Sequence, residues 1–246
     1  MKTYTAADLA EIIEKHRKWL AYEEGGARAD MSGAYLSLAD LRGAYLRDAD
    51  LRVADMSLAN LRGAYLRDAD LRGAYLSDAN LRVADLSLAK LRGANMSGAN
   101  MSGADMSGAD MSGADMSGAN LRGSDMSGAD MSRANLSDAN LRGANLSGAY
   151  LAEIASLWGV SGNGAEIKSI QCDLWPVTYT ATHMQIGCQL HRIEQWWDFG
   201  DAEIDRMDSR ALDWWQTWKP ILKQIVETSP AVPGAAKKPG EEPAAA

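Results

Sequence analysis

A five-residue repeat runs through half of this chain and limits its fold more than any other feature. From Ala29 to Leu151 the order is Ala, Asp or Asn, Leu or Met, Ser or Arg, and Gly. The alanine position recurs 25 times with one departure, Ser124, and the third position holds 16 Leu and 9 Met. Five residues at 100° each give no helical stripe, and an odd period puts successive leucines on opposite faces of a strand. The chain must therefore turn at each repeat, as a solenoid with Ala and Leu/Met inside.

A second period, of 20 residues, indicates four sides in each coil. Asparagine recurs at this spacing, and so does arginine two positions later, with Ser102 filling the gap in the arginine series: Asn60, Asn80, Asn100, Asn120, Asn140; Arg42, Arg62, Arg82, Arg122, Arg142. Coils stacked about 4.8 Å apart through backbone hydrogen bonds give a rod about 30 Å long. Each series should then form a column along the rod.

These repeats resemble the pentapeptide repeat family, and the resemblance covers about half of the chain. It implies an all-β solenoid, a right-handed quadrilateral β-helix of about six coils over residues 29–151. Solenoid ends expose unpaired strand edges, so both ends require caps. Residues 1–28 are expected to supply one cap, with a helix over 6–24 that ends at Gly25 and Gly26. His16 is interpreted as a packing residue of this cap, which resembles those of bacterial and phage-encoded members.

Residues 152–228 have a different composition, with most of the tryptophans and both cysteines. They predict a small α+β module. Strands are expected over 165–174, 177–181 and 183–188, and helices over 194–199, 201–207 and about 208–227, the last N-capped by Asp208 or Ser209. The module resembles the carboxyl-terminal part of phage and prophage pentapeptide repeat proteins, which implies a viral or mobile-element origin. The Pro/Ala-rich residues 229–246 are expected to be disordered.

The Cys and His residues of the module are its candidates for chemistry: Cys172, His183, Cys188 and His191. Four such ligands could form a closed structural zinc site, and Cys188 with His191 could form a nucleophile and base. The pairing of ligands typical of zinc sites is missing around Cys172, and buried free cysteines are common in strands. The sequence therefore favours packing roles and predicts neither a metal nor a cofactor.

The outward positions of the rod change composition along its axis. Arginines alternate with tyrosines in the first half, whereas the second half carries Asp105, Asp110, Asp115, Asp125 and Asp130. A solvated surface of alternating charge explains this pattern, and so does a polar binding wall with an acidic end. Quinolone-resistance proteins, which share the resemblance, are thought to imitate DNA toward gyrase through acidic surfaces. Residues 26–151 have a net charge of only −2, however, and an arginine column is unexpected in a mimic of a polyanion.

The sequence favours a non-enzymatic, protein-binding solenoid, with a phage or prophage factor that engages a host protein as its most specific form. Trp214, Trp215 and Trp218 share one face of the last predicted helix and are expected to contact a partner or a second copy. DNA mimicry and chemistry in the module are the alternatives. The net charge of −8 argues against direct nucleic-acid binding, and two cysteines with no long apolar run indicate a cytoplasmic protein without membrane contact.

Overall fold

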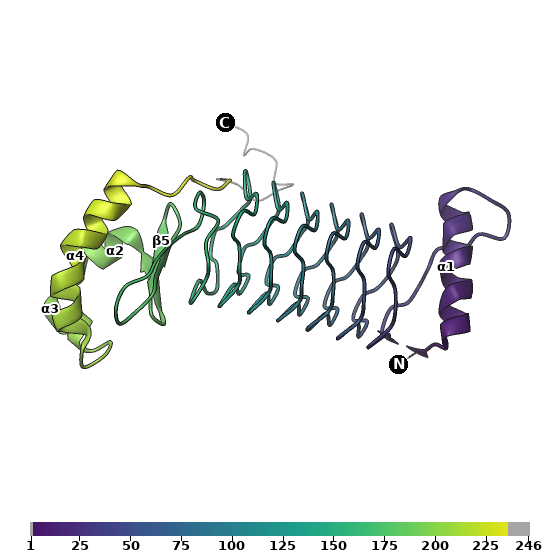
Figure 1. Cartoon of the computed structure of the whole chain (residues 1–246), viewed down its shortest axis with the longest axis horizontal. Helices are drawn as coiled ribbons and strands as arrows, with labels where there is room; N and C mark the ends of the chain where they lie inside the picture. Colours follow the sequence, from purple (N-terminus) through teal and green to yellow (C-terminus); the bar gives the residue numbers. More distant parts are fainter. Residues whose placement is uncertain (1, 236–246) are drawn as a thin grey trace, which may run out of the picture.

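The computed structural model describes residues 2–235 and shows a rod with a helix at one end and an α+β module at the other (Figure 1). Parallel bridges join residues 20 apart, from Asp30 with Asp50 through Asn120 with Asn140. Since each repeat has five residues, one coil has four sides. The bridges continue past Leu151, where Asn135 pairs with Ser156 and so gains one residue of spacing. The rod is thus longer than residues 29–151.

The interior of the rod is a stack of alanine, leucine and methionine side chains. Every Leu or Met of the third repeat position from Met31 to Leu146 is at most 2% exposed. Each side donates to the next coil and accepts from it: Leu81 N–H donates to Asn100 C=O at 2.8 Å, and Asn100 N–H donates to Ala79 C=O at 2.9 Å. The interior therefore has no room to contract when a side chain is shortened.

The four sides define four outer faces, which we number in chain order. Face 1 carries positions 30–33 and their equivalents every 20 residues, face 2 positions 35–38, face 3 positions 40–43 and face 4 positions 45–48. Faces 1 and 3 lie on opposite sides of the rod, as do faces 2 and 4. The last position of each face is a corner where φ is positive, as at Gly103 with φ of 66°.

Valine occupies one of these corners at Val83, where φ is 52° and the side chain is 53% exposed. A β-branched residue is strained in this left-handed region, which glycine enters freely. We expect Val83→Gly to raise the melting temperature by a few degrees, because relief of about 1–2 kcal/mol of strain outweighs the added backbone entropy of about 0.5–1 kcal/mol. Thermal unfolding measures this, with Gly103→Val in the next coil as the reverse change. A lower melting temperature for Val83→Gly would contradict it.

At the amino-terminal end, helix α1 (Ala6–Leu20) packs against the first coil. Thr5 and Asp8 form a capping box, and Leu9, Ile12 and Ile13 contact the rod interior. Strand β1 (Lys2–Thr3) pairs in parallel with β2 (Ala34–Tyr35) on face 2. The helix ends four residues before the predicted residue 24, because the chain turns through a positive φ of 57° at Tyr22.

His16 fixes α1 to the rod. Its side chain is fully buried, with Nε2 2.8 Å from Arg47 C=O and Nδ1 3.0 Å from Ala29 N–H. Because Nδ1 accepts from an amide, the proton is on Nε2, which donates to the carbonyl. Burial lowers the pKa of His16 below its usual 6.5 and keeps the ring neutral.

The carboxyl-terminal module contains a four-stranded antiparallel sheet in chain order: β3 (Lys168–Ile170), β4 (Val177–Tyr179), β5 (His183–Ile186) and β6 (Gln189–Arg192). Helices α2 (Ile193–Asp198), α3 (Asp201–Asp205) and α4 (Ala211–Thr228) follow. The sequence did not predict β6, which lacks an apolar alternation. Strand β3 is also shorter than the predicted 165–174.

Two other expectations for this end of the chain were wrong. The N-cap of α4 is Arg210, while Asp208 Oδ1 accepts from Arg210 N–H one turn earlier. Part of the predicted tail is also ordered: Val232 N–H donates to Ala165 C=O and Ala235 N–H to Ala149 C=O, so this segment lies along the end of the rod. The rest of the predicted disorder, residues 236–246, lies outside the described residues.

Candidate functional site

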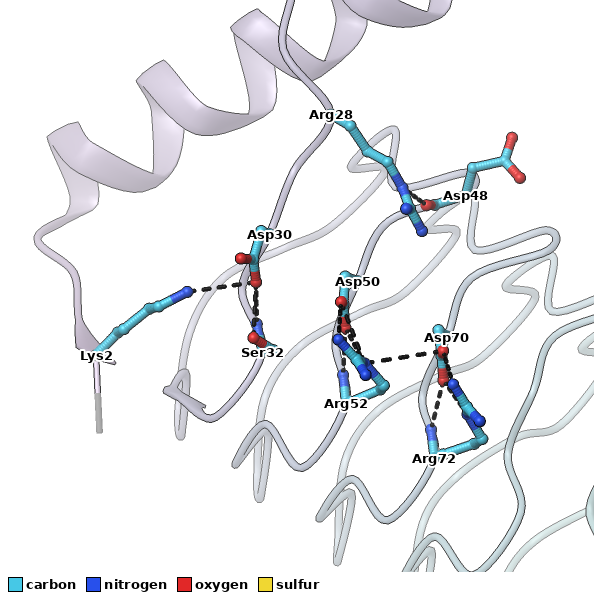
Figure 2. Close-up of polar contacts among 9 residues, drawn as sticks. All are labelled: Lys2, Arg28, Asp30, Ser32, Asp48, Asp50, Arg52, Asp70 and Arg72. Atoms are coloured by element: carbon cyan, nitrogen blue, oxygen red, sulfur yellow. Dashed lines mark hydrogen bonds and ion pairs between the residues drawn. The ribbon is translucent and has the colours of Figure 1, made fainter.

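Charge on face 1 is neutralised within the face. Figure 2 shows Lys2 paired with Asp30, Arg52 with Asp50 and Arg72 with Asp70. The carboxylate of Asp70 accepts two hydrogen bonds from the Arg72 guanidinium and one from its backbone N–H. The guanidinium beside it holds the pKa of Asp70 below its ordinary value. Face 1 is thus a ladder of internal ion pairs.

The five predicted acidic residues do not form one wall. Asp105 and Asp125 are neighbours on face 4, Asp110 and Asp130 are neighbours on face 1, and Asp115 lies on face 2. The prediction of a single acidic end is therefore wrong. Each of these carboxylates also accepts from the backbone N–H two residues later, for example Asp105 from Ser107 at 2.9 Å. They hold the turns of the rod whatever else they contact.

Face 4 contains the longest acidic column among the described residues. Asp85, Asp105 and Asp125 follow one another through parallel bridges, one coil apart. The other end of this face is aromatic, where the rings of Tyr45 and Tyr65 stack with centroids 4.8 Å apart. Hydrogen bonds from Ser127 lower the pKa of Asp125, so this carboxylate stays charged at neutral pH. Face 4 therefore presents an acidic half and an aromatic half.

Face 3 has the opposite character. All five of its arginines are exposed: Arg42, Arg62, Arg82, Arg122 and Arg142. Only the first has a carboxylate partner among the described residues, Asp40 at 2.6 Å. In the other coils the residue before is asparagine, whose Oδ1 accepts from the arginine backbone N–H, as Asn140 does from Arg142 at 3.2 Å. Asparagine makes the same turn as aspartate but leaves the arginine charge uncompensated.

The predicted tryptophan face lies largely inside the module. Trp214 and Trp215 are 7% and 3% exposed, and Trp214 Nε1 donates to Asp173 at 2.8 Å. With Trp175 and Trp196 they line an apolar pocket of about 90 Å³. Trp218 stacks on Trp214 and is partly exposed. An open tryptophan surface is therefore absent from these residues, and partner contact through them stays a prediction about the pocket and its edge.

The Cys and His candidates are not brought together. Within the described residues, no three His, Cys, Asp or Glu side chains are placed to hold a metal ion. Cys172 is buried in the module core, where burial raises its pKa to about 11, and Cys188 is exposed in the turn between β5 and β6. His183 contacts Thr182 Oγ1 at 2.9 Å, and His191 lies edge-on against Trp196. The geometry therefore does not form the predicted alternative zinc set.

A cleft at the carboxyl-terminal end of the rod was missed by the sequence reasoning. It encloses about 730 Å³ between the last coils and the module, and its lining includes Asp138, Arg142, Trp158, Lys168 and Tyr179. Trp158 is 45% exposed. Lys168 Nζ donates to Ser229 Oγ and C=O. The signal available was the arginine column itself, whose last member reaches this cleft.

No helix in the described part of the chain is long and apolar enough to cross a bilayer. Comparison with curated proteins gives no match. Among solved structures, the chain is similar to the pentapeptide repeat protein Rfr23 from the cyanobacterium Cyanothece 51142, with 38% identity, a TM-score of 0.37, and coverage of 38% of this chain and 63% of that one. The match thus spans less than two thirds of Rfr23.

HetL from Nostoc sp. strain PCC 7120, a protein involved in heterocyst differentiation regulation, is 31% identical with a TM-score of 0.39, covering 56% of this chain and 80% of HetL. QnrB1, a plasmid-mediated fluoroquinolone resistance protein, is 19% identical with a TM-score of 0.30, covering 54% of this chain and 83% of QnrB1. The sequence model of pentapeptide repeats matches residues 27–57, 54–93, 84–123 and 114–152, which together span half of the chain. The chain therefore belongs to the pentapeptide repeat family.

Proposed function

We propose that this protein is a non-enzymatic binding protein that engages a protein partner through its rod, as a phage or prophage factor acting on a host protein. The observation that carries the proposal is the set of long flat faces, each with its own charge, on a frame of hydrogen-bonded coils. Solenoids use such extended surfaces for binding. Proteins of this family are generally structural or binding proteins. In this reading α1 and the module cap the ends of the rod.

The acidic column of face 4 is the surface we assign to the partner. Asp85, Asp105 and Asp125 place three carboxylates in line about 4.8 Å apart, an arrangement suited to a basic protein surface. The same column favours DNA mimicry as the second candidate, because a row of anions imitates a phosphate backbone. The two candidates differ in whether the partner also binds DNA.

Affinity capture from a bacterial lysate with the full-length protein, followed by identification and binding assays with the purified partner, tests the proposal. We expect Asp105→Asn/Asp125→Asn to weaken binding at least tenfold. Asp55→Asn/Asp115→Asn on face 2 removes the same charge and should leave affinity unchanged. Equal affinity for all three proteins would contradict binding through face 4. Competition between duplex DNA and this protein for the partner would favour mimicry.

A further inference from the structure

The net charge of the rod conceals a strong separation between its faces. Within residues 29–151, face 3 has five arginines and one aspartate, whereas face 2 has four aspartates and no basic residue. Face 4 has five aspartates and two arginines. The cationic strip is therefore narrow, with carboxylates on both neighbouring faces. A net charge near zero says nothing about such a strip, because binding depends on the local field.

The arginines of face 3 are free in a way that those of the other faces are not. Arg52 and Arg72 on face 1 pair with aspartates at 2.6 and 2.5 Å, and Arg47 on face 4 pairs with Asp48 at 3.4 Å. On face 3, no carboxylate of the described residues lies within 4.0 Å of Arg62, Arg82, Arg122 or Arg142. The same scaffold thus compensates arginine elsewhere and leaves it uncompensated here.

The column is also long and regular enough for an extended ligand. From Arg42 to Arg142 it crosses five coil steps, which at about 4.8 Å each is about 24 Å. Guanidinium groups donate in a fork that matches phosphate oxygens. Between Arg122 and Arg142 the face is hollowed beside Asn140. The strip offers repeated phosphate contacts along a line.

The strip leads into the cleft beside the module, where an aromatic side chain is available. Arg142 belongs both to the hollow on face 3 and to the cleft. The cleft adds the ammonium group of Lys168 and the exposed indole of Trp158, and it contains one carboxylate, Asp138. Sites for single-stranded nucleic acid combine a basic track for the backbone with aromatic rings on which bases stack.

We propose that face 3 and the adjoining cleft bind single-stranded nucleic acid, with phosphates along the arginine column and a base stacked on Trp158. A duplex fits less well, because its second strand would extend over the aspartates of face 2 or face 4, and its paired bases are closed to stacking. This binding is additional to the protein partner assigned to face 4. It requires no base-specific contact, since the strip contains only backbone-directed groups.

Fluorescence anisotropy of a labelled 20-residue oligothymidylate with the full-length protein tests the proposal. We expect binding at low salt whose logarithm falls with the logarithm of salt concentration at a slope of about −3, from four to five phosphate contacts. Arg62→Gln/Arg122→Gln should weaken binding about tenfold and flatten the slope by about 1.4. Arg82→Gln/Arg142→Gln should repeat the effect if the first variant unfolds.

The matched control is Arg47→Gln/Arg67→Gln, which removes the same charge from face 4 and should change affinity less than twofold. Trp158→Ala should weaken binding about 5- to 100-fold, the range measured for loss of one stacked base. The proposal is overturned if the oligonucleotide does not bind, if the face 4 control weakens it equally, or if a duplex binds as tightly. Displacement by an equally charged polyglutamate at equal concentration would also overturn it, in favour of an acidic protein ligand.

Discussion

Leu81→Ala is expected to lower the free energy of unfolding by about 2–5 kcal/mol, the range found when a buried leucine is truncated in a rigid core. Leu81 is fully buried near the middle of the rod. The coils on both sides are held at fixed spacing by their hydrogen bonds, so the cavity cannot close. The substitution also weakens the interface between neighbouring coils, on which a linear repeat protein depends.

Urea denaturation of the full-length protein measures this loss, and the chain supplies its own control. Leu58 has the same side chain but is 57% exposed at a corner of the rod, so Leu58→Ala should change the free energy by no more than about 0.5 kcal/mol. Similar losses for the two variants would show that the interior of the rod repacks and that the argument from fixed spacing is wrong.

His16→Phe is expected to cost about 2–5 kcal/mol at the amino-terminal end of the rod. The variant keeps an aromatic ring but leaves Ala29 N–H and Arg47 C=O without a partner in a buried site, at about 1–3 kcal/mol each. Hydrogen exchange across α1 and the first coil measures the loss locally, and thermal unfolding measures it globally. Lys15→Ala, on the exposed side of the same helix, is the control and should change little.

The same histidine makes stability depend on pH. Its folded pKa lies below the unfolded value of 6.5, so the unfolded chain takes up the proton more readily. The stability contributed by the neutral ring is complete above pH 6.5 and is lost as pH falls through the folded pKa. Burial also lowers the pKa of His183 and His191, so the difference between wild type and His16→Phe isolates the contribution of His16. A difference that is constant from pH 7.5 to pH 5 would exclude this titration.

The sequence predicted the rod because a five-residue period with Ala and Leu/Met in fixed places has few other structural solutions. It failed where a tertiary contact decides the outcome. The rod continues to Ser161 because one extra residue before Ser156 is absorbed without breaking the column. Strand β6 forms because β5 pairs with it, from His183 opposite Arg192 to Ile186 opposite Gln189, although its own sequence has no strand pattern.

The candidate site was predictable only in part. The 20-residue spacing already separates Asp105 from Asp110 and Asp115, but the absence of a compensating charge on face 3 becomes evident only from the distances around each guanidinium. The burial of Trp214 and Trp215 depends on how α4 sits against the sheet and α2. Helix periodicity gives the apolar stripe of α4 but not what covers it.

The four-sided coil gives insertions and deletions in this chain an angular meaning. Loss of 20 residues from the repeat region shortens the rod by one coil and leaves every later side chain on its own face. Loss of five residues preserves the interior pattern equally well but moves every later residue back by one face. A five-residue deletion between Arg82 and Arg122 would transfer Arg122 and Arg142 from face 3 to face 2 and turn the module a quarter of the way around the axis. Such a gene would still encode a stable rod, but with its surfaces and its terminal module reoriented.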